Sequence, residues 1–345
     1  MTNAPEPVPQ KLKAILAKME DQKKRKKEIL KEAFKTSPVS DEILEHLMGM
    51  VGWDGDEVLS HHPGYKLNRG IESLRKALAI YHSCHQDLMT RLDEFDASAQ
   101  DPSLFYRPRE SELKGHEKAC RKEIFSLSSA AMALVDLARH VTKKIEIQNL
   151  KPIRENFFDM NLHEFIRELR RHLHHLTFLD ADWAVSVVGH NQTTYFKFHK
   201  EKILVDGEFN QKAKQFLRSQ PTDIDVRTLF ESYSGMVIDY YGWFFSEIEN
   251  YLPPEVIDYR RCFKKWKAFT ARSFYRVVFS QGINSGTDLY RYLPDYLMMD
   301  ELEEINRMPH RSKEQIDCII KILDTYEACD EELRGLIYKG FQIEL

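Results

Sequence analysis

A chain of 345 residues with 42% hydrophobic and 30% charged side chains is long enough for several domains and is too apolar for a disordered protein. The formal net charge of −4 argues against a protein that coats nucleic acid through its overall charge, although a local basic site remains compatible with it. Five scattered cysteines without a CxxC pair predict free thiols in a reducing compartment, and no apolar run reaches about 18 residues, so no transmembrane helix is predicted. We therefore expect a cytoplasmic protein without membrane contact.

The N-terminal third is predicted to be mostly helical. Residues 10–36 carry a broken apolar repeat around an entirely polar middle, so this helix is expected to project or to pack only in part. The longest basic run of the chain, Lys23–Lys27, lies in that middle and fits either a solvated helix face or an arm that contacts phosphates. A short helix is expected over 41–50, and the apolar stripe of 65–95 predicts a long helix.

The middle third combines helices with a small β element. Residues 110–144 predict a second long helix, and a further helix is expected over 161–177. Two β-rich runs, 183–188 and 193–198, are separated by a Gly-His-Asn-Gln sequence that is typical of a hairpin turn. A hairpin of this size is marginally stable alone, so we expect it to pack on the helices.

The rest of the chain returns to helix. Helices are expected over 212–219 and 224–251, and the many aromatic residues of the second are expected to lie in the core. The segment 256–345 is also predicted to be helical, with an interruption rich in Gly, Ser and Asn at 282–286 and a final helix near 312–338.

These elements predict a mostly α fold, a multi-helix bundle with one small inserted β-hairpin at about 183–205. Three regions are expected along the chain. They are an N-terminal helical region over 1–104, a central helical domain with the hairpin over 105–255, and a C-terminal helical region over 256–345.

The helix predicted over 161–177 separates apolar from basic side chains. At about 100° per residue, one stripe of this helix is entirely apolar. Its members are Leu162, Phe165, Ile166, Leu169, Leu173 and Leu176. Beside the stripe, an i, i+4, i+7, i+11 ladder makes neighbours of four basic side chains, which are His163, Arg167, Arg170 and His174.

Arginine and histidine in such a ladder suit the cleavage of an RNA phosphodiester without a metal ion. The guanidinium fork matches a phosphate, and an imidazole exchanges a proton near neutral pH. A base would take the proton of the 2′-hydroxyl, and a cation would stabilise the charge that develops on the phosphorus oxygens. The residues alone favour a solvated basic flank without catalytic function.

The same helix resembles the R-x(4–6)-H motif of the HEPN superfamily, all-helical domains with many ribonuclease members. The usual local form of that motif is Leu-Arg-Asn-x-x-x-His, and Leu169, Arg170 and His175 match its spacing. The order of long helix, motif helix, hairpin and aromatic helix is also similar to the family, over roughly 105–255. Arg171 departs from the family, which most often has Asn or another small polar residue there.

The resemblance implies a metal-independent endoribonuclease without a cofactor that acts as a toxin or as an effector of antiviral defence. It further implies an RNA substrate, a homodimer in which two subunits bring their motifs together, and control by an antitoxin or sensor protein. Arg170 would bind and polarise the phosphate, His175 would exchange the proton, and the product would carry a 2′,3′-cyclic phosphate.

Helix geometry favours a different histidine from the family spacing. On an ideal helix His174 lies about 40° from Arg170, whereas His175 lies about 140° away. Both histidines therefore remain catalytic candidates. The flanking groups Arg167, Arg171 and His163 are the candidates for substrate binding.

Other clusters carry weaker predictions. Histidines 172, 174 and 175 on one helix cannot all converge on a tetrahedral ion, and no cysteine is near, so no metal site is predicted. The segment Tyr259–Trp266 interleaves rings with basic residues, which suits either RNA stacking or an ordinary exposed helix. The alternative function for the whole chain is a non-catalytic helical scaffold that binds a protein or an RNA.

Overall fold

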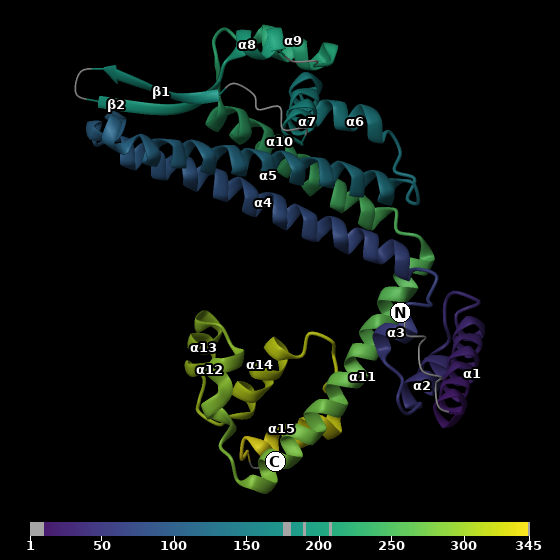
Figure 1. Ribbon diagram of the computed structural model, residues 1–345. Helices are drawn as coiled ribbons and strands as arrows, with labels where there is room; N and C mark the ends of the chain where they lie inside the picture. Colours follow the sequence, from purple (N-terminus) through teal and green to yellow (C-terminus); the bar gives the residue numbers. More distant parts are fainter. Residues whose placement is uncertain (1–9, 175–180, 189–190, 207–208, 344–345) are drawn as a thin grey trace, which may run out of the picture. The chain divides into compact units, whose positions relative to one another are not determined.

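The structure is a computed structural model that describes residues 10–174, 181–188, 191–206 and 209–343 (Figure 1). It is 77% helical, with 15 α-helices and a small three-stranded antiparallel sheet among these residues, so the predicted fold class is confirmed. The chain forms two compact units. We call Met1–Asn68 with Pro253–Leu345 the terminal unit, and Arg69–Leu252 the central unit.

These units correct the predicted division into three regions. The two ends of the chain, expected to be separate regions, fold together into the terminal unit. The predicted boundary at 104/105 lies inside the central unit, whereas the boundary at 255/256 falls close to the observed one at 252/253. Apolar periodicity shows which face of a helix is buried but not which distant helix covers that face. The packing of the two chain ends against each other could therefore not be predicted from the sequence.

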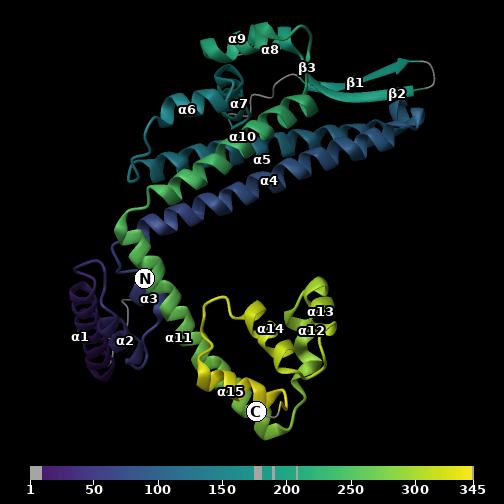
Figure 2. The same cartoon turned by 180° about the vertical axis from the view of Figure 1, so that it is seen from behind.

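Three long helices form the base of the central unit and lie side by side in both views (Figures 1 and 2). They are α4 (Tyr65–Ala99), α5 (Glu110–Thr142) and α10 (Val226–Asn250). The aromatic residues of α10 were expected to lie in the core. The prediction is confirmed for five of them, which are Phe230, Tyr233, Tyr240, Tyr241 and Phe244. Tyr81 of α4 also lies in this core, where its hydroxyl is 2.8 Å from Ser234 Oγ.

Helix α5, with the turn before it, contains a long apolar stretch. The segment Arg107–Thr142 is long and apolar enough to cross a membrane. However, 44% of its most apolar window is buried inside the protein, and the core helix of a soluble protein passes the same test, so this is weak evidence for a membrane span.

Shorter elements cover one side of the three-helix base. The helices are α6 (Leu150–Phe157), α7 (Met160–His174), α8 (Lys200–Asp206) and α9 (Gln211–Ser219), and two 3-10 turns, η1 (Pro102–Phe105) and η2 (Arg107–Arg109), join α4 to α5. The strands are β1 (Ala181–Val188), β2 (Asn191–Phe198) and β3 (Ile224–Asp225), in the order β1-β2-β3. The predicted hairpin is confirmed, with Trp183 opposite Phe196, but its expected extension to 205 is wrong because α8 occupies that segment.

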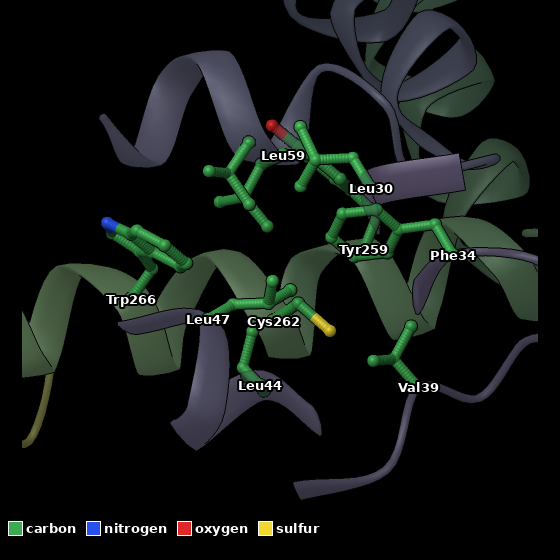
Figure 3. Close-up of a cluster of buried hydrophobic side chains, with 10 residues drawn as sticks. Leu30, Phe34, Val39, Leu44, Leu47, Leu59, Tyr259, Cys262 and Trp266 are labelled. Atoms are coloured by element: carbon green, nitrogen blue, oxygen red, sulfur yellow. The ribbon is translucent and has the colours of Figure 1, made fainter. Parts of the chain in front are cut away.

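In the terminal unit, helices from both ends of the chain pack against the long helix α11 (Pro254–Ser285). The N-terminal members are α1 (Gln10–Ala33), α2 (Asp41–Gly49) and α3 (Gly55–Leu59). Figure 3 shows side chains of this segment, among them Leu30 and Leu44, converging on Tyr259, Cys262 and Trp266 of α11. The polar middle of α1 is exposed except for Lys26, which is partly buried and pairs with Glu57 at 2.7 Å.

The C-terminal segment of the terminal unit is also helical but is divided differently from the prediction. Its elements are η3 (Leu289–Tyr292), α12 (Leu293–Tyr296), α13 (Met299–Asn306), α14 (Lys313–Leu323) and α15 (Glu331–Gly340). The single final helix predicted near 312–338 is therefore wrong. The break follows Asp324, whose carboxylate accepts the backbone N–H groups of Ala328 and Cys329 and so stabilises a turn.

Candidate functional site

Helix α7, which carries the ladder of basic residues, begins and packs for identifiable reasons. Asp159 caps it by accepting from the backbone N–H of Asn161 at 2.8 Å. The predicted apolar stripe is confirmed where the structure describes its side chains, because Leu162, Phe165, Ile166 and Leu169 are all buried. The stripe faces α5 and α9, and this packing fixes the rotation of the helix and the direction of its basic flank.

His163 is placed in the core instead of on an exposed flank. Its side chain is 8% exposed, its Nδ1 lies 2.9 Å from the hydroxyl of Tyr233, and its ring packs on Phe158. Burial lowers the pKa of His163 to about 4, so the imidazole is neutral near pH 7. The expected contact of His163 with substrate is therefore corrected: the residue joins α7 to α10.

Arg167 and Arg171 each pair with a carboxylate of the same helix. Arg167 Nη2 lies 2.6 Å from Glu164 Oε2, and Arg171 Nη2 lies 2.7 Å from Glu168 Oε2. Asn210, the N-cap of α9, donates to both carboxylates at 2.8 and 3.1 Å. The four charges cancel, and the arrangement ties α7 to the start of α9.

Arg170 differs from both neighbouring arginines. It is partly buried, and its Nε is inaccessible to water yet has no hydrogen-bond partner within the described part of the chain. Among those residues it also forms no ion pair with a carboxylate, in contrast to Arg167 and Arg171. A buried donor without an acceptor is uncommon in folded proteins and is often found where a ligand supplies the acceptor.

The two candidate catalytic histidines lie where α7 ends. His174 is the last residue of the helix, and its side chain is not among those described. His175 lies outside the described residues. The choice between the two histidines therefore stays a prediction. Their neighbour His172 stacks its ring on Phe209, with the ring centroids 4.4 Å apart.

Two further arginines approach this region from other helices, and the sequence did not single them out. Arg139 of α5 and Arg154 of α6 lie near enough to His163 to lower its pKa further, as does Arg167. The Nε of Arg154 is also buried without a hydrogen-bond partner among the described residues. Both arginines lie on other helices than the motif, so the sequence pattern of the motif helix gave no reason to select them.

A separate cluster in the terminal unit contains residue types that bind metals. Donor atoms of His62, Asp258 and Cys262 all lie within 4.8 Å of one another. The Asp258 carboxylate, however, already accepts from Val39 N–H at 2.8 Å and from Arg261 Nη2 at 2.9 Å. Burial raises the pKa of the Cys262 thiol to about 11, so the free thiol is protonated at pH 7. These contacts indicate a structural cluster, which we call the Asp258 cluster.

The basic-aromatic segment Tyr259–Trp266 also has a structural explanation. Trp266 is buried, Lys265 pairs with Asp41 at 2.5 Å, and Lys264 pairs with Glu327 at 2.7 Å. These lysines thus form ion pairs within the terminal unit. This favours an ordinary packed helix over an RNA-stacking surface.

No family model, curated protein or solved structure matches this chain. The HEPN resemblance therefore rests on the residues of the motif and on the order of elements around it.

Proposed function

We propose that this chain is a metal-independent endoribonuclease of the HEPN type, in which Arg170 binds the scissile phosphate. The observation that best supports the proposal is the partly buried Arg170 guanidinium, whose Nε has no partner among the described residues. Arg167 and Arg171 are neutralised by carboxylates, and the arginine that the family spacing selects is not. A phosphate oxygen would supply the missing acceptor.

The proposed reaction is an internal transfer at phosphorus. The 2′-oxygen of one ribose forms a bond to the adjacent phosphorus while the bond from phosphorus to the 5′-oxygen breaks. His175, or His174 in its place, takes the proton of the 2′-hydroxyl, and an acid returns a proton to the leaving 5′-oxygen. Arg170 stabilises the negative charge that develops on the phosphorus oxygens. The products are a 2′,3′-cyclic phosphate and a 5′-hydroxyl.

The remaining members of the flank have a supporting function in this proposal. The guanidinium groups of Arg167 and Arg171 are about half exposed but are balanced by Glu164 and Glu168, so their contacts with RNA would be weak and would depend on salt. Arg171, the departure from the family pattern, is paired with Glu168.

The test is cleavage of mixed RNA by the purified chain in the presence of EDTA. We expect new ends that carry a 2′,3′-cyclic phosphate, and their loss in Arg170→Ala. Arg218→Ala on the exposed face of α9 is the matched control and should cleave like the unaltered chain. Cleavage that EDTA abolishes, or that survives in Arg170→Ala, would contradict the proposal.

The alternative of a non-catalytic helical scaffold is favoured by one specific observation. The burial of His163 and the pairing of Arg167 and Arg171 leave a large part of the predicted ladder engaged within the protein. A scaffold would bind RNA or a protein partner without generating new RNA ends. Intact RNA together with a monomer in solution would support the scaffold.

A further inference from the structure

The C-terminal segment of the terminal unit encloses a cavity of about 610 Å³ between the second half of α11 and helices α12, α14 and α15. This volume falls within the range of roughly 300–1,000 Å³ that is typical of sites for small molecules. Two glycines permit the close packing that shapes its wall. A Cβ atom on Gly340 would lie 2.9 Å from Leu289 and 3.0 Å from Phe279, and one on Gly282 would lie 3.3 Å from Leu289.

The lining of the cavity is apolar and rich in aromatic rings. Aliphatic side chains of α14 and α15 form much of it. The aromatic members are Phe274, Tyr275, Phe279, Tyr292, Tyr296 and Phe341. Two of these rings are prominently exposed, Tyr296 by 71% and Phe274 by 62%, so they stand where a ligand would enter. The face of an aromatic ring attracts a cation, and several rings around one space are typical of sites for quaternary ammonium groups.

The charge of the lining is negative. Asp324 is its one charged residue, and no Lys, Arg or His of the described chain contributes to it. The two carboxylate oxygens of Asp324 each accept one backbone N–H, from Ala328 at 2.7 Å and from Cys329 at 2.9 Å. These bonds fix the carboxylate, and each oxygen can still accept from, or face, another group.

The carboxylate lines the same cavity as two of the tyrosines. Tyr275 and Tyr296 line the cavity together with Asp324, and both Asp324 and Tyr296 add to the effect of burial in raising the pKa of Tyr275. An anionic ligand placed there would lose its hydration beside a fixed negative charge without gaining a cationic partner, which is unfavourable. A cationic ligand would gain both the carboxylate and the ring faces.

We propose that this cavity binds a small apolar molecule that carries one positive charge, such as an aryl-alkyl quaternary ammonium compound. The ammonium group lies among Tyr275, Tyr296 and Asp324, and the apolar part extends between α11 and the helices α14 and α15. The site is independent of the proposed ribonuclease activity, because its residues all belong to the terminal unit.

The test is isothermal titration of the full chain with three probes that share a phenyl group and an alkyl chain of similar length. They are 3-phenylpropyltrimethylammonium, 4-phenylbutanol and 4-phenylbutyrate, which carry positive, neutral and negative ends. We expect the ammonium probe to bind about tenfold more tightly than the alcohol, which corresponds to the strength of a desolvated cation–π contact. The carboxylate probe should bind more weakly than the alcohol.

Two variants test the assignment of residues. Asp324→Asn should weaken the ammonium probe about tenfold and leave the alcohol unchanged, because the amide keeps the shape of the side chain but not its charge. Tyr296→Leu, at an exposed position that contributes little to folding, should also weaken the ammonium probe, whereas the exposed control Tyr106→Leu in the central unit should not. Equal affinity for the three probes, binding of none of them, or binding unaffected by both Asp324→Asn and Tyr296→Leu would overturn the proposal.

Discussion

Replacing Asp258 by alanine should destabilise the terminal unit by about 3 kcal/mol, because several donors lose one shared acceptor. Removal of one partner of a buried ion pair typically costs about 3–5 kcal/mol. The Arg261 side chain is 35% exposed and also pairs with Asp41, so water and Asp41 recover part of the loss, which brings the expected cost to the lower end. The buried N–H of Val39 has no such compensation.

Urea unfolding, followed by circular dichroism, measures this change in the free energy of unfolding. Hydrogen exchange provides the local measurement, and peptides from α2 and the first turns of α11 should lose protection before those of the central unit. Asp56→Ala is the matched control, because Asp56 is an exposed aspartate whose contact with Lys267 is 3.5 Å long, and it should change stability by less than about 0.5 kcal/mol. A cost below about 1 kcal/mol for Asp258→Ala, with unchanged exchange, would refute the argument that the carboxylate holds this unit together.

The Asp258 cluster also predicts how stability depends on pH. Neutral His62 can donate from Nε2 to Asp258, at 3.1 Å, and accept at Nδ1 from the backbone N–H of Gly64, also at 3.1 Å. Burial lowers the pKa of His62 below its ordinary value of 6.5, against the opposing effect of Asp258. The unfolded chain therefore binds the proton more readily than the folded one. This contribution is complete above pH 6.5 and is lost as the pH falls from there toward the folded pKa, so His62→Gln should reduce the slope of stability against pH in that interval.

Four further predictions concern the central unit. His175→Ala should abolish RNA cleavage and His174→Ala should only weaken it, and the opposite order in a single-turnover assay would exchange their assignments. Glu168→Gln removes the charge that balances Arg171, so RNA affinity in a filter-binding assay should rise and depend more steeply on salt concentration. Tyr233→Phe removes the hydroxyl beside a buried histidine and should lower the free energy of unfolding by about 1–2 kcal/mol in urea titrations. Arg170→Leu should abolish cleavage and leave the free chain at least as stable, whereas a clear loss of stability would show a structural function.

The sequence predicted much of the fold because helix periodicity directly reflects burial. The stripe of α7 from Leu162 to Leu169 was located correctly, as were the long helices and the hairpin. The division of the last segment was not, because it depends on a turn held by Asp324, a hydrogen-bonding pattern without a Gly or Pro signal. The joining of the chain ends was missed for a different reason, since it depends on contacts such as Val39 with Asp258, more than two hundred residues apart.

The candidate site was predicted less completely than the fold. A helical wheel orders the side chains of one helix but does not show which neighbouring helix covers each side. His163 was therefore assigned to an open flank, although Tyr233, seventy positions away, buries it. The pairing of Arg171 could have been inferred, because Glu168 precedes it by three positions and such residues are neighbours on a helix.

The contrast among the arginines of α7 is the strongest argument that this flank is more than a solvated surface. A solvated arginine extends to water or to a carboxylate, as the half-exposed Arg167 and Arg171 do. Arg170 instead keeps its Nε buried, and no residue in the described part of the chain accepts from it; a buried donor left without an acceptor costs about 1–3 kcal/mol relative to a paired one. In the proposed function, a phosphate oxygen would remove this cost, and the free energy recovered would contribute to the affinity for RNA. A functional site is expected to lower the stability of the free protein in this way and to bind its ligand more tightly as a result. A scaffold that used α7 only for packing would gain nothing from it.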